Sequence, residues 1–129
     1  MNIPAELRYS KEHEWVRVEG NIAVVGITDF AQEELGDIVN VELPDEDDTF
    51  ATDEAFGAVE SVKASSEVFC PVGGKILEIN EPLFDTPEIL NEDPYDEGWM
   101  IKLEMADSSE LDKLMDAEAY KKYIEEESK

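Results

Sequence analysis

In the middle of this 129-residue chain stands Phe56-Gly57-Ala58-Val59-Glu60-Ser61-Val62-Lys63-Ala64-Ser65-Ser66-Glu67-Val68-Phe69-Cys70. Residues 56–62 and 67–70 are rich in β-branched and aromatic types, which favour short strands. Residues 63–66 between them are small or polar, as in a tight turn. The segment therefore predicts a β-hairpin near 56–70 that carries Lys63 at its tip.

Further segments continue the β pattern on both sides of this hairpin. They are short, rich in β-branched residues and bounded by turn residues, and their ranges are 14–19, 22–27, 38–43, 75–80 and 99–105. The last of these alternates strictly, so one set of side chains, which begins with Trp99, is expected to be buried. The other set, which begins with Met100, is expected to face solvent. Such strands predict a small sandwich of two antiparallel sheets.

Helical segments are predicted between and after these strands. Thr28 offers the N-cap of a short helix over 29–35. A second helix is predicted over 86–91, with its first residue, a threonine, as N-cap. Apolar residues at helical spacing predict a helical segment over about 108–127, whose second part Asp116 caps. The length suits one domain, residues 1–129, that is mainly β with short α-helices.

The composition excludes several classes of protein. Asp and Glu number 34 against 10 Lys and Arg, so the formal charge is −24. This argues against a nucleic-acid partner, because phosphate contacts need clustered Lys and Arg. No apolar run approaches the roughly 18 residues of a membrane span, and no signal-peptide pattern is visible. We therefore expect a cytoplasmic protein that does not enter a membrane.

Metal sites and standard catalytic templates are also missing. One cysteine, Cys70, and one histidine, His13, cannot form an internal disulfide or a Cys/His zinc site. The acidic loop 45–48 lacks the spacing and glycine of an EF-hand, so a solvated loop is the better interpretation. No Walker loop or GxSxG is present. The chain therefore works either through carboxylates or through a group attached to it.

Lys63 is the candidate for the residue to which such a group is attached. Composition alone favours an ordinary exposed lysine. A Schiff-base lysine needs desolvation, whereas a hairpin tip near Glu60 and Glu67 favours a charged amine. A tip lysine between the small neighbours Val62 and Ala64 suits post-translational acylation.

At this point the residues carry a resemblance. Segment 56–64, Phe-Gly-Ala-Val-Glu-Ser-Val-Lys-Ala, resembles the lipoylation motif of the glycine cleavage system H protein family, among the biotinyl/lipoyl attachment proteins. Segment 9–16, Tyr-Ser-Lys-Glu-His-Glu-Trp-Val, is similar to the N-terminal signature of that family. Later family motifs are similar, in the same order, to 25–32, 35–44, 70–76 and 91–100. Cys70, Gly73 and Lys75 depart from the commoner Ser, Ser and Glu.

The resemblance implies a barrel-sandwich hybrid fold and a carrier that is not itself an enzyme. Its cofactor is lipoate, held covalently on Lys63. The implied partners are glycine decarboxylase (a pyridoxal-phosphate enzyme), a tetrahydrofolate-dependent aminomethyltransferase and dihydrolipoyl dehydrogenase. A lipoate ligase or a lipoyl/octanoyl transferase would attach the group. The carrier would take the aminomethyl group of glycine from the first enzyme to the second, as a monomer when isolated.

The resemblance also implies a cleft with carboxylates for the arm once it carries an amine, because water would hydrolyse the exposed cargo. The positions here that match are Glu12, Glu14, Glu34 and Glu67, and we favour Glu14 and Glu67. For Glu12 and Glu34, a solvated acid is the better interpretation. His13 is expected to be structural or to lie at a docking surface.

Alternatives remain open at this stage. The chain could be an H-like lipoyl carrier that relays lipoate to other proteins. It could also be an acidic interaction protein or a hydrolase that works through paired carboxylates. A biotin carrier fits less well, because such carriers typically place Met on both sides of the lysine, where this chain has Val62 and Ala64.

Overall fold

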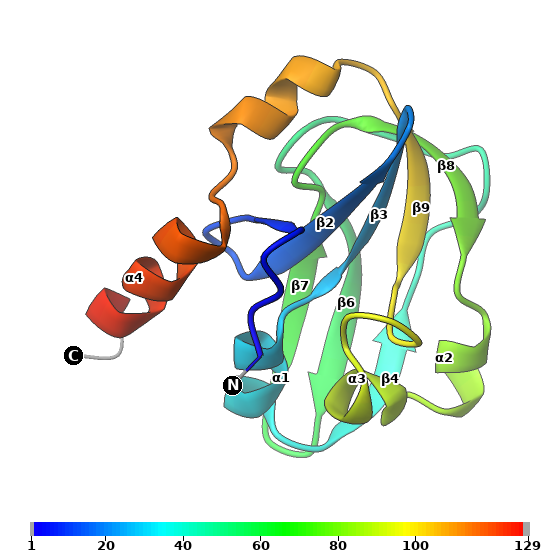
Figure 1. Cartoon of the computed structure of the whole chain (residues 1–129). Helices are drawn as coiled ribbons and strands as arrows, with labels where there is room; N and C mark the ends of the chain where they lie inside the picture. Colours follow the sequence, from blue (N-terminus) through cyan, green and yellow to red (C-terminus); the bar gives the residue numbers. More distant parts are fainter. Residues whose placement is uncertain (1, 128–129) are drawn as a thin grey trace.

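The computed structural model describes residues 2–127; residues 1 and 128–129 of the predicted domain lie outside the described part. The strands are β1 (Arg8–Tyr9), β2 (Glu14–Glu19), β3 (Ile22–Ile27), β4 (Ile38–Glu42), β5 (Thr49–Phe50), β6 (Ala55–Ser61), β7 (Ser65–Phe69), β8 (Gly74–Ile79) and β9 (Ile101–Met105). The helices are α1 (Asp29–Leu35), α2 (Pro82–Asp85), α3 (Ile89–Glu92), the 3₁₀ helix η1 (Ser108–Lys113) and α4 (Ala117–Glu127). Figure 1 shows η1 and α4 running outside the body of strands.

The strands form two antiparallel sheets. The larger sheet has the order β1-β2-β3-β9-β8-β5, and the smaller has the order β4-β6-β7. The central hairpin is β6 and β7, so it makes up most of the smaller sheet. The predicted fold class, mainly β in two antiparallel sheets with short helices, is confirmed.

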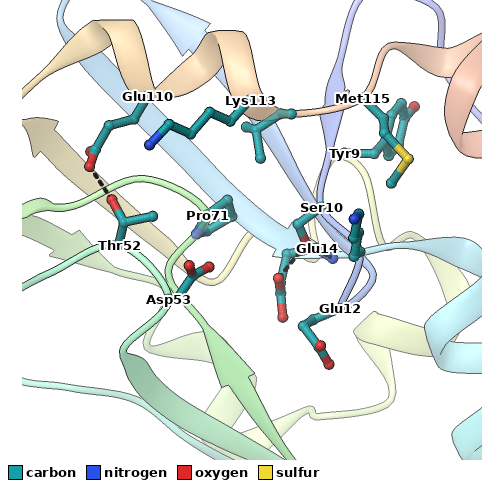
Figure 2. Close-up of a pocket in the computed structure, with 12 residues that line it drawn as sticks. Tyr9, Ser10, Glu12, Glu14, Thr52, Asp53, Pro71, Glu110, Lys113 and Met115 are labelled. Atoms are coloured by element: carbon teal, nitrogen blue, oxygen red, sulfur yellow. Dashed lines mark hydrogen bonds between the residues drawn. The ribbon is translucent and has the colours of Figure 1, made fainter.

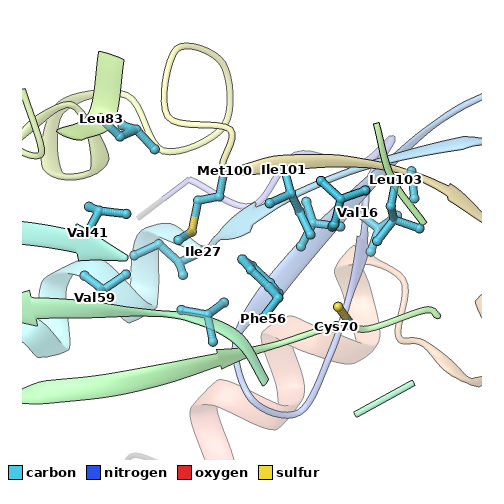
Figure 3. Close-up of a cluster of buried hydrophobic side chains, with 14 of the residues drawn as sticks. Val16, Ile27, Val41, Phe56, Val59, Cys70, Leu83, Met100, Ile101 and Leu103 are labelled. Atoms are coloured by element: carbon cyan, nitrogen blue, oxygen red, sulfur yellow. The ribbon is translucent and has the colours of Figure 1, made fainter. Parts of the chain in front are cut away.

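Alternation along the strands fills the space between the sheets with apolar side chains, among them Val16, Phe56, Val59 and Leu103 (Figure 3). Met100 is also fully buried there, so the prediction that it faces solvent is wrong. The reason is that β9 begins only at Ile101. Met100 precedes the regular alternation, and its N–H donates to the Val25 carbonyl at 2.8 Å.

The opposite face of the larger sheet carries a second apolar cluster. Trp15 alternates with Val16 and is fully buried in this cluster, where Tyr9 stacks on Tyr120 of α4 with ring centroids 4.6 Å apart. Trp99 packs against the same cluster but is only half-buried. The C-terminal helix α4 is therefore attached to the sheet by aromatic packing.

The first predicted helix is confirmed and the second is wrong in its bounds. The Thr28 hydroxyl accepts the Ala31 N–H at 3.2 Å and caps α1 over the predicted residues. Instead of one helix over 86–91, α2 and α3 follow each other. Thr86 ends α2 rather than capping a helix, because its N–H donates to the Pro82 carbonyl at 2.9 Å.

The predicted C-terminal helical segment consists of two parts. Between η1 and α4 the chain is extended, and Met115 and Tyr9 exchange two backbone hydrogen bonds of 2.8 Å. The Asp116 carboxylate accepts the Ala119 N–H at 2.8 Å, which confirms the predicted cap. Within residues 2–127, no helix is long and apolar enough to cross a membrane.

Candidate functional site

The turn of the β6–β7 hairpin spans 62–64, shorter than the predicted 63–66, because Glu60 and Ser65 still pair as strand residues. Ser61 organises this turn. Its N–H donates to the Ala64 carbonyl at 2.7 Å, and its hydroxyl accepts the N–H groups of Lys63 at 3.3 Å and Ala64 at 3.1 Å. Local hydrogen bonds therefore hold the backbone of the tip in one conformation.

The Lys63 side chain is exposed at this tip. Next to it, the Val62 N–H donates to the Asp37 carbonyl at 3.0 Å, which fixes the turn to the segment after α1. A Cβ built on Gly36 would lie 3.5 Å from Lys63 Cε, so the lysine stem passes over Gly36. Among the described residues no carboxylate forms an ion pair with Lys63. The structure therefore leaves the amine open to solvent and to a partner.

Glu14 lies in the opposite environment, at the start of β2. Only 2% of its surface is exposed. The Ser10 hydroxyl donates to one carboxylate oxygen, and the Phe69 N–H of β7 donates to the other at 3.2 Å. Burial raises the pKa of Glu14 from 4.5 to about 7, although these two hydrogen bonds lower it and the negative charges of Glu12 and Asp53 raise it further. Glu14 thus links the two sheets through a carboxyl group that titrates near neutrality.

A cavity of about 350 Å³ lies beside Glu14. Figure 2 shows that its lining comes from several separate parts of the chain. These lining residues are Tyr9, Ser10, Lys11, Glu12, Glu14, Thr52, Asp53, Pro71, Glu110, Lys113, Leu114 and Met115. The cavity has both apolar walls and carboxylates, which suits a small cationic group on an apolar stem.

The four predicted cleft acids do not come together as one set. Glu12 and Glu14 line the same cavity. Glu67 is exposed on β7, opposite Ala58, and is not among the residues that line it. Glu34 lines a separate hollow of about 340 Å³ beside His13. The acids Asp53 and Glu110 do line the cavity, but the sequence offered no signal for them because they stand in a chain with 34 acids.

His13 forms contacts that fit a structural role. Its Nδ1 lies 2.9 Å from the Tyr120 hydroxyl, which lies 2.6 Å from the Thr28 hydroxyl. Its Nε2 lies 3.0 Å from a Glu127 carboxylate oxygen. His13 therefore connects the turn before Glu14 to α4 and to the start of α1.

Comparisons with known proteins agree with this arrangement. The sequence model of the glycine cleavage H-protein family matches residues 7–127. The chain belongs to that family. It is 58% identical over 127 residues to the glycine cleavage system H protein of Anaeromyxobacter sp. (strain K), a match that covers 98% of this chain and 99% of the relative. It is 53% identical to the protein of the same name from Carboxydothermus hydrogenoformans, covering 97% and 96%.

The fold comparison gives the same family. The crystal structure of a glycine cleavage system H protein from Mycobacterium marinum superposes with a TM-score of 0.85 and 32% identity, covering 98% of this chain and 100% of that one. The predicted family and its barrel-sandwich architecture are confirmed. The predicted role is confirmed with them: the chain is a lipoyl carrier in glycine cleavage.

Proposed function

We propose that Lys63 Nζ is the atom that forms an amide with lipoate, and that the chain is a substrate of its partner enzymes without catalytic activity of its own. The observation that carries this assignment is the exposure of Lys63 on a turn that Ser61 holds rigid. An enzyme can then reach the amine without unfolding the hairpin. Amide formation removes the charge of the lysine.

The position of Lys63 directs a lipoyl group along β7, toward the end of the strand that binds Glu14. The lysine stem and the lipoyl chain span on the order of 10–15 Å. β7 begins at Ser65, two residues after Lys63, and at about 3.3 Å per strand residue the path from Lys63 to Glu67 is about 13 Å and the path to Phe69 at most about 20 Å. The end of the arm therefore reaches the level of Glu67, and the Phe69 N–H that binds Glu14 lies two residues further along β7. Bound lipoate would supply a disulfide that accepts the aminomethyl group of glycine.

Glu14 is the residue that we propose to receive the cationic amine of this cargo. A carboxyl group with a pKa of about 7 is near half-ionised at neutral pH, and a neighbouring cation favours its ionised form. Ser10 and Phe69 hold the two carboxylate oxygens in fixed directions. A cargo that filled the cavity beside Glu14 would displace water from it.

The other three candidate acids receive different proposals. Glu12 shares the cavity and adds negative charge beside Glu14. Glu67 lies on β7 between the tip and Phe69, where it would meet the amine on its way. Glu34 belongs to the hollow beside His13, so a solvated acid remains the better interpretation of it.

The proposed partners are those of the glycine cleavage cycle: a pyridoxal-phosphate glycine decarboxylase, an aminomethyltransferase that uses tetrahydrofolate and dihydrolipoyl dehydrogenase. A lipoate ligase or a lipoyl/octanoyl transferase would modify Lys63. We place this cycle in the cytoplasm, since a single buried thiol, Cys70, suits a reducing compartment.

Intact mass of the natively produced chain, with peptide mapping, tests the assignment. We expect one lipoyl group, located on Lys63. Addition of the lipoylated chain to a glycine cleavage assay that lacks its carrier should restore ammonia release. Modification at another lysine would contradict the site, and modification without restored turnover would favour a relay of lipoate to other proteins.

A further inference from the structure

The cavity beside Glu14 lies between two walls that are far apart in the sequence. One wall is η1 and the residues just after it, represented by Lys113 and Leu114. The other wall comprises Thr52 and Asp53, which follow β5, together with Pro71. Figure 2 shows Glu110 beside Thr52 at one end of the cavity and Glu14, with Ser10 and Glu12, toward the other. The cavity therefore keeps its shape only while these two walls stay together.

Glu110 of η1 connects the two walls. One of its carboxylate oxygens accepts the Gly73 N–H at 3.0 Å, and the other accepts the Thr52 hydroxyl. Hydrogen bonds to an ionised carboxylate are the stronger kind. The Gly73 backbone packs closely against the chain at β5, because a Cβ on Gly73 would lie 3.0 Å from the Phe50 carbonyl oxygen.

The remaining supports of η1 are contacts at its ends and one bond from β1, in which the Arg8 guanidinium donates to the Leu111 carbonyl at 3.4 Å. Asp107 caps its start by accepting the Ser109 N–H at 3.0 Å. Beyond its other end, Met115 exchanges two hydrogen bonds with Tyr9. Leu111 packs against the core but is only partly buried. A 3₁₀ helix has poor hydrogen-bond geometry of its own, so Glu110 is the polar contact that holds the middle of η1 against the opposite wall.

We propose that Glu110 is a positioning residue of the carrier. Its hydrogen bonds join η1 to Thr52 and Gly73 and thereby keep water away from the aminomethyl cargo at Glu14. This inference rests on the proposed function. It assigns a role to η1, which lies outside the attachment motif. Glu110 itself touches neither the attachment lysine nor the Glu14 carboxyl.

The first test uses the full unlipoylated chain and measures the titration of the Glu14 carboxyl by carbon-13 NMR. The wild-type chain should titrate near pH 7, because Glu14 is buried. Glu110→Ala should titrate closer to 4.5, because an open wall admits water. The matched control is Asp112→Ala, an exposed acid on the same helix, which removes the same charge and should titrate like the wild type.

The second test loads the lipoylated chain with the aminomethyl group and follows its hydrolysis. Water attacks the aminomethyl carbon and displaces the sulfur, which leaves as a thiol, and the aminomethanol formed then collapses to formaldehyde and the ammonia that is measured. Glu110→Ala should release ammonia about tenfold faster, since losing hydrogen bonds to a charged group shifts the opening equilibrium by at least that factor. Thr52→Val should also release faster, and Thr52→Ser should restore the slow rate because it keeps the hydroxyl. Acylation of Lys63, on a different part of the chain, should keep its rate in every variant.

The two tests separate the possible failures. A Glu110→Ala chain that is folded, titrates like the wild type and releases ammonia at the wild-type rate would overturn the proposed role of Glu110. If Glu110→Ala does not fold, the Thr52→Val and Thr52→Ser pair decides by the same readouts. If Lys63 takes no lipoate even in the wild-type chain, the proposed function fails, while the Glu14 titration still decides whether Glu110 holds the cavity closed.

Discussion

The hairpin tip exposes its ionisable group to solvent, whereas the Glu14 cavity buries its central carboxyl. The tip is built from consecutive residues, its hydrogen bonds come from Ser61, and its lysine stands in water. The cavity is built from distant segments, and its central carboxyl is 2% exposed. A carrier needs both environments, because a partner must reach the arm while the cargo must avoid water. The difference means that the attachment point is a local feature and the protection a tertiary one.

Lys63→Arg should have the largest effect, and only on the chemistry of the tip. A guanidinium keeps the charge but does not replace the amine in acylation, so lipoylation and carrier activity should be lost completely. The unfolding free energy should change by less than about 0.5 kcal/mol, as for other exposed sites. Intact mass after incubation with ligase, ATP and lipoate, together with urea unfolding, checks both statements. Lys75→Arg, an exposed lysine of the larger sheet, is the control and should be lipoylated normally.

Glu14→Gln should have the next largest effect, on stability as a function of pH. The folded chain keeps the Glu14 proton up to about pH 7, whereas the unfolded chain loses it near 4.5. Between these values the folded state binds more protons, so the unfolding free energy falls as pH rises through this window and levels off above it. Glu14 should account for a decline of about 3 kcal/mol.

Urea unfolding at a series of pH values measures this decline. The Glu14→Gln chain should lack it, so the difference between the two curves isolates Glu14 from the general repulsion of the acidic chain. The control Glu12→Gln removes the same charge two residues away, at an exposed site, and should keep the decline. Parallel curves for the wild type and Glu14→Gln would mean that Glu14 is hydrated in solution.

The sequence predicted the parts of the fold that depend on local signals, and it missed the parts that depend on tertiary contacts. Strands 14–19 and 22–27 were predicted to the residue, because the period-two pattern of the first, the apolar run of the second and the turn residues Gly20 and Asn21 between them are local signals. The helix near 86–91 was misplaced, because Thr86, its expected N-cap, donates its N–H to the Pro82 carbonyl and ends α2. Contacts with distant residues also fix this segment, since the Asn91 side chain donates to the Gly36 carbonyl at 2.9 Å and accepts the Ile38 N–H at 2.9 Å.

The candidate site divides in the same way. Lys63 stood out as a lone lysine on a predicted turn, and the tip has the predicted exposure. The acids around Glu14 could not be sorted by pattern, because which of them is buried depends on packing between β2, β7 and η1. Glu67 was favoured with Glu14, yet it is exposed and outside the cavity, whereas Asp53 and Glu110 line it.

Tyr120→Phe should weaken the attachment of α4 to the larger sheet and leave the tip unchanged. The buried Tyr120 hydroxyl bonds to Thr28 and His13, and its loss should lower the unfolding free energy by about 1–2 kcal/mol while the ring still stacks on Tyr9. Urea unfolding measures this loss. Tyr123→Phe, whose hydroxyl donates to the Lys11 carbonyl at 3.1 Å near the surface, is the matched control and should cost less. A slower acylation of Lys63 in Tyr120→Phe would contradict the independence of the two regions.

Ser61→Ala should have the smallest effect and should be confined to the tip. The Ser61 hydroxyl accepts two backbone N–H groups of an exposed turn, where water can replace it, so the unfolding free energy should fall by only about 0.5–1 kcal/mol. Because the turn then samples more conformations, acylation of Lys63 should slow by about two- to fivefold. A time course of intact mass with ligase, ATP and lipoate measures this rate. Ser65→Ala, an exposed serine at the start of β7, should acylate like the wild type; equal slowing in both variants would show that the turn geometry set by Ser61 does not control access to the amine.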